Sequence, residues 1–585
     1  MERRLPPLED LVGDMFVDRE WELETLWEWA TSVPNPALSS FALVGRRRTG
    51  KTAILVKLFN RLFWEQERVL PVFVSFAGYV GRDRALTGYE FAREYLGGYL
   101  AGYLAFRYRR PEIVGHRRNL AYLRLLARQM QDEAALWWLE NYDRLLEEPS
   151  SYGVMQWVIN MPSEEARQRG MPTVIIVDEF QVLTDVYDPP QDTHYVLTNS
   201  FQSAAETKWA PLLVSGSAVS LLVRKALGGM LSGRFHYHHL GPLTRDYAQD
   251  LVFRLGESAG VTVNEELAEA IWQLTGGFPY SIYALLTSFS PARRRFPALD
   301  ALEEVLLFEL TDTDGKLWQH FSEEFEKYDA LLNTGQVTKK VMLWAVKYPG
   351  ERIDARRVAQ ETGLTDEEVQ AALRRLYRAD IVDKVGWTLY EGPRDPMLRK
   401  YIEYNYRQEI EDLSPAEAVR DWQTEYRRLM GRVNNFIGEV AEVYVGAVMR
   451  KFDGREVDGE HYFGRSGPVT LPRFERVVRR GGVVRGGVPF EIDLTGEWDA
   501  GRRAWLVQVK YKRSPAGVED IARFLEQVAT VAEEKEYAQV ERWYFCKQGY
   551  TAEAAEKLRE AGVLFSDRQR FNALANLFGF FGLPE

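Results

Sequence analysis

The segment Phe41-Ala-Leu-Val-Gly45-Arg-Arg-Arg-Thr-Gly50-Lys51-Thr52 joins an apolar run to a glycine-bounded loop, and a helical pattern follows over residues 53–63. Residues 45–52 match the pattern G-x-x-x-x-G-K-[ST], which is typical of a phosphate-binding loop between a strand and a helix. Glycines permit a tight turn in which backbone N–H groups converge on phosphates, and the helix N-terminus adds a favourable dipole. The segment therefore predicts a P-loop nucleotide site within an α/β fold.

The side chains of this loop have separate expected tasks. Lys51 brings a positive charge to the β- and γ-phosphates, and the Thr52 hydroxyl is a ligand for Mg²⁺. We therefore expect ATP and Mg²⁺ as cofactors. The other residues expected to line the nucleotide are Gly45, Arg46, Arg47, Arg48, Thr49, Gly50 and Ala53. Three consecutive arginines are unusual in such a loop, and they either contact phosphates or face solvent.

Two acids follow the apolar run 173–177. An acid at the carboxyl end of a core strand can hold Mg²⁺, and a neighbouring acid can polarise the attacking water. We assign Asp178 to the metal and Glu179 to the general base. A further apolar run, 212–214, ends in polar residues, of which Ser215 or Ser217 either senses the γ-phosphate or is an ordinary turn serine.

Apolar runs at 41–44, 69–76, 173–177 and 212–215 alternate with helical patterns. Uniformly apolar strands of this kind predict a parallel sheet covered on both faces. Residues 85–165 show helical spacing and predict a helical insertion. Its most apolar part, 95–106, is too short for a membrane span of roughly 20 residues, so we expect a buried helix and no membrane association.

Length and composition limit the class of protein. At roughly 100–200 residues per domain, 585 residues predict about three to five domains. The net charge of -11 excludes a chain that is basic throughout, so any DNA contact must be local. The only cysteine, Cys546, excludes a disulfide framework and a cysteine-rich zinc site. The N-terminus shows no apolar signal region, and we expect a cytoplasmic protein.

The middle of the chain is helical. Near the N-terminus, Asp18 is a candidate N-cap for a helix in the range 16–30. Residues 365–368 (Thr-Asp-Glu-Glu) form a capping box that opens a helix over 367–377, and 381–390 alternates around Gly386 like a small wing. The helix over 367–377 carries arginines that could contact DNA. Its N-terminal residues are acidic, however, and recognition helices contact bases through these residues, so the sequence favours a structural or regulatory role for the winged helix.

Three further features resemble the STAND class of signal-transducing ATPases, in the branch common in archaea and thermophilic bacteria. They are Phe16…Arg19-Glu20…Leu23, Gly233-Arg234 ahead of Pro242-Leu243, and Gly276-Gly-Phe-Pro279. The resemblance covers roughly residues 10–400. It implies an ATPase core followed by a helical lid and a winged helix, with Arg19 and Pro279 near the nucleotide. It also implies that Arg234 acts as an arginine finger on a neighbouring subunit; the alternative is a surface ion pair.

The C-terminal part presents a second set of polar residues. Glu442 lies on a predicted helix, and Asp493 lies on the predicted strand 490–494. After a hairpin at 499–502 comes the strand 504–510, on which Gln508 and Lys510 share a face because they are two residues apart. The separation along the chain allows the hairpin to bring these four residues together.

This set resembles the PD-(D/E)xK, or restriction-endonuclease-like, nuclease fold over roughly residues 431–585. The resemblance implies a Mg²⁺ site formed by Glu442, Asp493 and Gln508, with Lys510 steering the attacking water. Gln508 departs from the usual acid, although its carbonyl still suits a hard cation. Glu442 would supply the missing charge, and Glu491 replaces Asp493 if the register is shifted by two.

Residues 473–485 are rich in arginine and glycine. The segment holds Arg473, Arg476, Arg479, Arg480 and Arg485 against Glu475 alone, and Gly481, Gly482, Gly486 and Gly487 lie among and beside them. A flexible basic hairpin beside a metal site suits contacts with the phosphate backbone of double-stranded DNA, together with Lys512 and Arg513. The alternative is a solvated loop.

Together these patterns predict an α/β protein of several parts: a P-loop ATPase core (1–240) with a helical insertion (about 80–165), a helical lid (241–320), a winged helix (321–405), a helical connector (406–430) and a nuclease-like domain (431–585). The main hypothesis is a homo-oligomeric ATPase that regulates a metal-dependent DNA endonuclease, and the resemblance suggests defence against foreign DNA. The alternatives are an ATP-dependent switch or scaffold that does not cut, and an ATPase of DNA repair or recombination.

Overall fold

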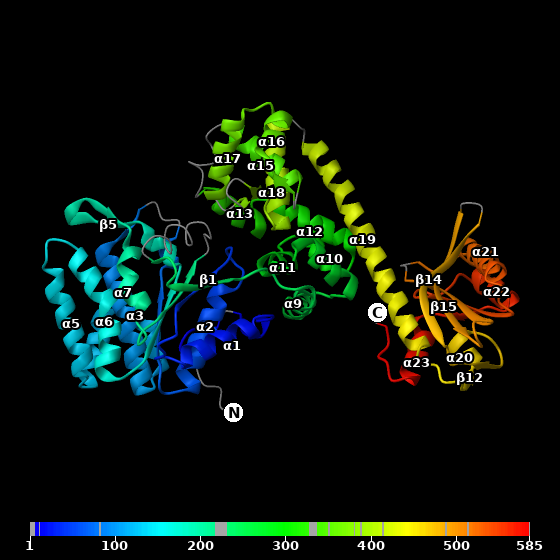
Figure 1. Cartoon of the computed structure of the whole chain (residues 1–585), viewed down its shortest axis with the longest axis horizontal. Coiled ribbons are helices and arrows are strands. Elements are labelled where there is room, and N and C mark those ends of the chain that lie inside the picture. The colour runs from blue at the N-terminus through cyan, green and yellow to red at the C-terminus, as the bar shows by residue number, and fades with distance from the viewer. Residues whose placement is uncertain are drawn as a thin grey trace. The chain divides into compact units, whose positions relative to one another are not determined.

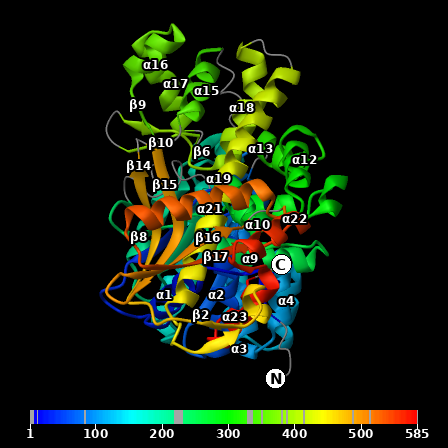
Figure 2. The same cartoon turned by 90° about the vertical axis from the view of Figure 1, so that its right-hand side faces the viewer.

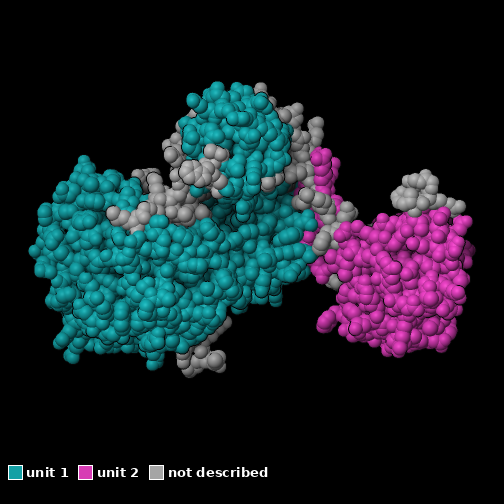
Figure 3. All heavy atoms as spheres, in the orientation of Figure 1, with its two compact units in different colours: residues 1–263, 271–420 teal, residues 264–270, 421–585 magenta. Residues whose placement is uncertain are grey.

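A computed structural model describes residues 6–10, 12–80, 84–216, 231–326, 336–348, 351–378, 381–385, 389–411, 415–485, 488–511 and 514–583 (Figure 1). The chain divides into two compact units (Figure 3). Unit 1 comprises residues 1–263 and 271–420, and unit 2 comprises residues 264–270 and 421–585.

The core of unit 1 is a five-stranded parallel sheet. In spatial order its strands are β2 (Leu70–Ser75), β4 (Thr173–Asp178), β7 (Leu212–Gly216), β1 (Ser40–Val44) and β8 (Phe235–His239). Every residue of β1, β4 and β7 is buried, as the uniformly apolar runs predict. The expected parallel sheet is therefore confirmed. Because β7 lies between β1 and β4, the ends of these three strands meet at one edge.

Helix α3 (Gly88–Tyr108) contains the apolar stretch 95–106, all of which is buried. Its glycines let it approach the backbone of β2: a Cβ atom at Gly98 or Gly102 would lie 2.9 Å from a carbonyl oxygen of that strand. The expected buried helix is confirmed. Among the described residues, no helix combines the length and the apolar character needed to cross a bilayer.

The remaining elements around the sheet are α1 (Glu20–Thr31), α2 (Lys51–Glu65), α4 (Leu120–Gln129), α5 (Glu133–Leu146), α6 (Tyr152–Arg169) and α7 (Gln202–Glu206). A small sheet of β3 (Leu86–Thr87), β5 (Val186–Asp188) and β6 (Thr193–Tyr195) was not predicted. The expected N-cap at Asp18 is wrong. Arg19 precedes α1 without a side-chain cap, and the Asp18 carboxylate instead accepts a hydrogen bond from the distant Thr244 N–H.

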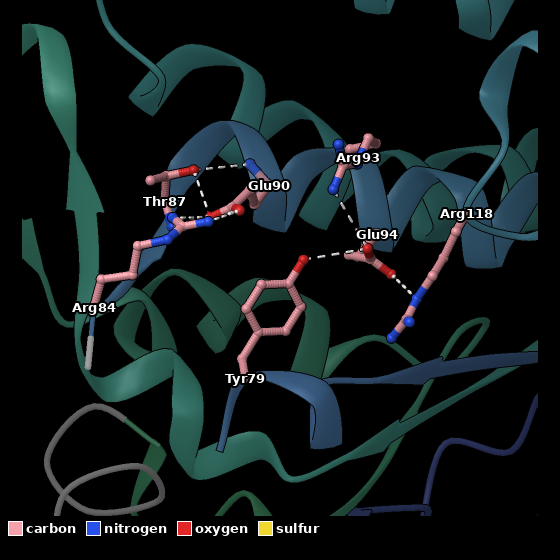
Figure 4. Close-up of polar contacts among 7 residues, drawn as sticks. All are labelled: Tyr79, Arg84, Thr87, Glu90, Arg93, Glu94 and Arg118. Atoms are coloured by element: carbon pink, nitrogen blue, oxygen red, sulfur yellow. Dashed lines mark hydrogen bonds and ion pairs between the residues drawn. The ribbon is translucent and has the colours of Figure 1, made fainter. Parts of the chain in front are cut away.

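Polar contacts fix the start of α3 (Figure 4). The Thr87 hydroxyl caps the helix, while Glu90 accepts from the Thr87 N–H and from both terminal nitrogens of Arg84. One turn later, the buried Glu94 accepts hydrogen bonds from the Tyr79 hydroxyl and the Arg118 guanidinium. Tyr79 follows the carboxyl end of β2 closely. This network therefore connects the helical insertion to the side of the sheet where the strands have their carboxyl ends.

Unit 1 continues as helices with one small antiparallel sheet. The elements are α9 (Arg245–Ser258), α11 (Pro279–Leu286), α12 (Leu299–Thr311), α13 (Lys316–Glu326), α15 (Gln336–Lys347), α16 (Ala355–Thr362), α17 (Asp366–Arg378), α18 (Pro396–Glu411), β9 (Arg352–Ile353), β10 (Asp383–Lys384) and β11 (Tyr390–Glu391); α10 (Glu265–Thr275) begins in unit 2. The capping box is confirmed, since Glu368 and Thr365 exchange side-chain and backbone hydrogen bonds at the start of α17. Gly386, at the centre of the expected wing, lies outside the described residues.

Unit 2 contains a mixed sheet in the order β14 (Arg476–Arg485), β15 (Val488–Trp498), β16 (Arg503–Lys510), β17 (Gln539–Cys546) and β18 (Leu564–Ser566) (Figure 2). The pairs β14–β15 and β15–β16 are antiparallel, and β16–β17 and β17–β18 are parallel. Other elements are α19 (Pro415–Met449), α20 (Gly459–Phe463), α21 (Val518–Glu534), α22 (Ala552–Glu560), α23 (Arg568–Leu577), β12 (Glu456–Asp458) and β13 (Pro468–Thr470).

Alternate residues of the central strands build two separate cores. Trp505 and Val507 pack with α19, α20 and α23, while Ala504, Leu506 and the buried Cys546 pack with α21 and α22. This alternation is what period-two side-chain direction produces in a sheet covered by helices on both faces.

Candidate nucleotide site and candidate metal site

The loop between β1 and α2 is shaped by its two glycines. Gly50 has φ +100°, a backbone conformation that side chains disfavour, and it leads directly into α2. A Cβ atom at Gly45 would lie 2.8 Å from the Leu240 carbonyl oxygen. Within the loop, the buried Thr49 hydroxyl donates to the Arg46 carbonyl at 2.9 Å, so the turn is fixed from inside. Ala53, in the first turn of α2, is half-buried.

Lys51 is buried, and its ammonium group donates to the Gly45 carbonyl at 2.8 Å and to the Arg46 carbonyl at 2.6 Å. Burial lowers the pKa of Lys51 to about 8, although the charges of Glu179 and Asp178 oppose the change. The lysine is thus held by the loop's own carbonyl groups in a site that disfavours its charge. A bound phosphate would offer the ammonium a stronger, negatively charged acceptor.

Asp178 ends β4 and is buried between two hydroxyl groups. The Thr52 hydroxyl donates to one carboxylate oxygen at 3.0 Å, and the Ser215 hydroxyl of β7 donates to the other. Burial raises the pKa of Asp178, and the neighbouring charge of Glu179 raises it further. The oxygens of Thr52 and Asp178 are the type of ligand that Mg²⁺ prefers, so the pair fits the expected metal.

Of the two serines predicted as γ-phosphate sensors, the structure describes one. Ser215 bonds Asp178 directly, as described above, while Ser217 lies outside the described residues. The predicted base, Glu179, has φ +59°, and its carboxylate accepts a hydrogen bond from the Gln181 side chain. A left-handed conformation at a residue other than glycine costs free energy and often marks a functional position. The general-base role of Glu179 stays a prediction.

The residues that the first resemblance places near ATP come from different parts of the chain. Arg19 is buried, and its guanidinium donates to the Gly241 carbonyl at 2.7 Å. Pro279 is the first residue of α11. Arg234 forms an ion pair of 2.7 Å with Glu206, which is the alternative to the finger role that the sequence left open. Neither the roles of Arg19 and Pro279 nor the finger role is tested by these contacts.

Two of the loop arginines interact with residues that follow the core. The Arg48 guanidinium lies 3.8 Å from the centre of the Tyr280 ring, and Arg48 itself has φ +61°. Burial raises the pKa of Asp395, and the charge of Arg46 acts in the opposite direction. The sequence did not indicate Tyr280 or Asp395 as partners of the loop, since nothing in their spacing relates them to residue 48 or 46.

In unit 2, the predicted residues converge at Asp493. Its carboxylate accepts hydrogen bonds from the Gln508 side-chain amide and, at 2.7 Å, from the Val509 N–H. Burial raises the pKa of Asp493, while the charge of Lys510 lowers it. The Oε1 atom of Gln508 is buried and has no hydrogen-bond partner among the residues that the structure describes. An unsatisfied buried oxygen beside a carboxylate fits a cation ligand, since such an atom otherwise costs free energy.

The sheet is distorted at Asp493. Asp493 is skipped in the pairing with both neighbouring strands. Between β15 and β16 the first pair is Leu494–Val507, and between β14 and β15 the pair Arg479–Leu494 is followed directly by Gly481–Ile492. Ile492 and Leu494 accordingly pack into opposite cores, although residues two apart normally share a face. The strand is therefore irregular at the residue that the sequence singled out.

Glu442, on α19, completes the candidate metal site. Burial raises its pKa, and repulsion from Asp493 raises it further, while Arg480 and Arg479 act against this. The described part of the chain contains no group of three or more His, Cys, Asp or Glu side chains able to hold a metal. The site thus offers two carboxylates and an amide oxygen. Glu491, the substitute for Asp493, lies 3.8 Å from the Arg480 guanidinium.

The arginines of 473–485 do not act as one loop. Most of them belong to β14, which pairs with β15 on both sides of Arg480, and Arg473 donates to the Asp453 carbonyl. Gly486, Gly487, Lys512 and Arg513 lie outside the described residues. Arg479 and Arg480 face Glu442, a contact that the sequence did not predict.

The parallel sheet, the glycine loop after β1 and the buried acid at the end of β4 form an α/β fold with the arrangement that the sequence predicted for a P-loop. No protein-family model matches the chain, and no curated protein matches it. Its structure is similar to the Walker-type ATPase PABY2304 of Pyrococcus abyssi, with 16% identity, 66% of this chain and 96% of that chain covered, and a TM-score of 0.43.

Two further solved structures are similar over comparable lengths. One is the Aeropyrum pernix ORC1 protein in complex with DNA, with 16% identity, 69% of this chain and 97% of that chain covered, and a TM-score of 0.31. The other is the Thermotoga maritima RuvB Holliday junction branch migration motor, with 13% identity, 67% and 96% covered, and a TM-score of 0.29.

Proposed function

We propose that this protein binds and hydrolyses ATP as a STAND-like ATPase and that unit 2 is a metal-dependent DNA endonuclease under its control. The observation that supports the first part is the convergence of Lys51, Thr52 and Asp178 at the ends of neighbouring strands. Lys51 would neutralise phosphate charge, Thr52 and Asp178 would hold Mg²⁺, and Glu179 would act as the general base toward the attacking water. Mg²⁺ would polarise the γ-phosphate.

Phosphate release from ATP tests this part. Lys51→Ala should lower ATP affinity, and Asp178→Asn should lower hydrolysis by about 100-fold or more while sparing metal-free ATP binding. Lys57→Ala is the matched control, because Lys57 lies on the same helix and pairs with Asp10. A Lys51→Ala protein that binds ATP as tightly as the wild type would contradict the nucleotide assignment.

The endonuclease part is supported by the buried, unsatisfied Gln508 Oε1 beside Asp493. Glu442, Asp493 and Gln508 would hold Mg²⁺, which when bound polarises a phosphodiester and acidifies a water. Lys510, next to Asp493, would stabilise the negative charge that develops on the phosphate. The mixed sheet with helices on both faces agrees with the restriction-endonuclease-like resemblance, and the order α15, α16, α17 and β10–β11 agrees with a winged helix.

One observation favours a second candidate, a unit 2 that binds nucleic acid without cutting. The site has an amide where the resembling nucleases have a third acid, so its negative charge is lower. Incubating plasmid with protein, Mg²⁺ and ATP separates the two candidates. Cutting that is lost in Lys510→Ala but kept in Lys535→Ala, a change at an exposed residue after α21, supports the endonuclease. Binding without cutting by the wild type supports the scaffold.

We further propose that ATP changes contacts between copies of the chain and that these contacts activate DNA cleavage by unit 2. Such regulation would suit defence against foreign DNA. Arg234 is the candidate arginine finger in such an assembly. Its guanidinium pairs with Glu206 at the surface, so the finger role requires that this ion pair open. The mass of the particle with and without ATP tests the assembly. An unchanged mass, with ATP bound, would contradict regulation by oligomerisation.

A further inference from the structure

Two adjacent arginines of β14 contact the same carboxylate. The Arg479 Nε lies 3.4 Å from a Glu442 carboxylate oxygen, and the Arg480 Nε lies 3.8 Å from the same oxygen. In a regular strand, neighbouring side chains point to opposite faces, so two consecutive residues do not reach one partner. Arg480 has φ +51°, which breaks this alternation and turns both guanidinium groups toward Glu442.

The surrounding backbone builds this kink into the sheet. By register, Arg480 lies opposite Asp493, where the pairing of β14 and β15 is interrupted. The next two positions are glycines whose replacement is obstructed: a Cβ at Gly481 would lie 2.8 Å from the Thr495 hydroxyl, and one at Gly482 would lie 2.3 Å from the Phe490 carbonyl oxygen. A left-handed arginine held in place by its neighbours indicates a functional demand on its side chain.

The guanidinium groups of Arg479 and Arg480 can change their charged partners. Arg480 also forms an ion pair of 2.6 Å with Glu439, one turn before Glu442 on α19, and lies 3.8 Å from Glu491. Both arginine side chains retain solvent access, at 35% and 50% exposure. A divalent cation bound by Glu442 would compete directly with these guanidinium groups. Arginine released from a carboxylate is well suited to a phosphate, which it can bind through two parallel hydrogen bonds.

We propose that Arg479 and Arg480 form a clamp that neutralises Glu442 until a divalent cation takes this carboxylate, and that the clamp then binds a phosphate of the nucleic-acid backbone. The inference rests on the proposed metal site of unit 2 and adds its regulation. Metal binding and phosphate binding are thereby coupled, because the same two side chains oppose the first and contribute to the second.

Two titrations of the full-length protein test the clamp. Mn²⁺ alone is titrated by calorimetry, and a fluorescent DNA duplex is titrated in Ca²⁺ at several salt concentrations. The variants are Arg479→Ala and Arg480→Gly, the latter chosen because glycine accepts φ +51° without added backbone strain. Arg476→Ala is the control, since Arg476 lies on the same strand opposite Glu497.

The expected result is a change of opposite sign in the two titrations. Each variant should bind Mn²⁺ about three- to tenfold more tightly, because a competing cation is gone. Each should bind DNA more weakly, with the slope of log K against log salt reduced by about 1. Arg476→Ala should leave Mn²⁺ binding unchanged.

The failures are distinguishable. If wild-type protein binds Mn²⁺ at a site that Asp493→Asn removes, but the arginine variants match the wild type, the clamp is refuted while the metal site stands. If the variants bind Mn²⁺ more tightly and DNA equally well, the phosphate role is refuted. If neither the wild type nor any variant binds Mn²⁺, the proposed function of unit 2 fails together with the clamp.

Discussion

ATP binding should draw a proton into the loop, because the ammonium of Lys51 lies where its charge is disfavoured. With a pKa of about 8 in the empty loop, roughly half of the molecules carry a neutral Lys51 at pH 8. A bound triphosphate favours the charged form and restores the pKa toward its ordinary value near 10.5. We expect an uptake of about 0.5 proton per ATP at pH 8, about 0.1 at pH 7 and about 0.9 at pH 9.

The affinity for ATP should follow the same equilibrium. Below pH 8 Lys51 is already protonated, so affinity is independent of this group. Above pH 8 each binding event must first recruit a proton, and Kd should rise by up to about tenfold per pH unit until about pH 10. The assay is calorimetric titration with ATP in two buffers of different ionisation enthalpy, without Mg²⁺. The metal is omitted because its binding at Asp178, whose pKa is raised by burial, would add a proton exchange of its own to the measured heat.

A matched variant sharpens this test. Lys57→Ala, on the same helix but paired with Asp10, should keep the full uptake at pH 8. The reasoning is refuted if wild-type protein binds ATP at pH 8 with the same heat in both buffers. It is also refuted if Lys51→Met, titrated at higher concentration, takes up as many protons as the wild type.

Three further changes should affect stability. Gly277→Ala should destabilise the fold by about 2–4 kcal/mol in denaturant unfolding, because its Cβ would lie 2.2 Å from a backbone carbonyl oxygen and its φ is +80°. Gly260→Ala, at φ +64° but with open space around the Cβ, should cost only about 1 kcal/mol. Equal costs for the two changes would contradict the packing argument. Glu90→Gln should cost about 1 kcal/mol at pH 7, where the exposed Arg84 stabilises the carboxylate. The hydrogen bond with Arg84 lowers the pKa of Glu90 to about 2, so this cost should be complete above pH 4.5 and disappear as pH falls to 2; a difference independent of pH would argue against the pair. Ser215→Ala should cost about 1–3 kcal/mol and raise the pH needed for Mg²⁺-dependent hydrolysis, because it removes a donor from a buried carboxylate; an unchanged pH profile would refute that link.

The elements that the sequence predicted are those with one dominant local signal. The strands of 41–44, 173–177 and 212–215 are buried on both faces, so their apolar runs are unambiguous. The capping box at Thr365 is likewise a short-range pattern. The sequence does not indicate strand β8 (Phe235–His239), because it lies at the edge of the described sheet beside β1 and carries three histidines on a partly exposed surface.

Contacts between distant segments were harder to foresee. The sequence groups Gln508 with Lys510 because residues two apart on a strand share a face, and it adds Asp493 because the intervening residues are enough for a hairpin. The arginines near Glu442 were predicted only as a flexible basic segment. Their convergence depends on a left-handed residue at 480, and arginine gives no sequence signal for that conformation. In the same way, the sequence around Asp18 predicts a local cap, whereas its side chain accepts a hydrogen bond from a residue more than two hundred positions away.

The single cysteine of the chain offers an intrinsic reporter. Cys546 is buried at the end of β17 and lies opposite Lys510 in the parallel register. A thiol reagent can reach it only when this part of the sheet opens, so the labelling rate measures the population of that opening. Because no other thiol reacts, an intact-mass measurement on unaltered protein gives the rate directly. Ligands that stabilise the strands around Lys510 should slow the labelling, and ligands confined to unit 1 can be tested for the same effect at a distance.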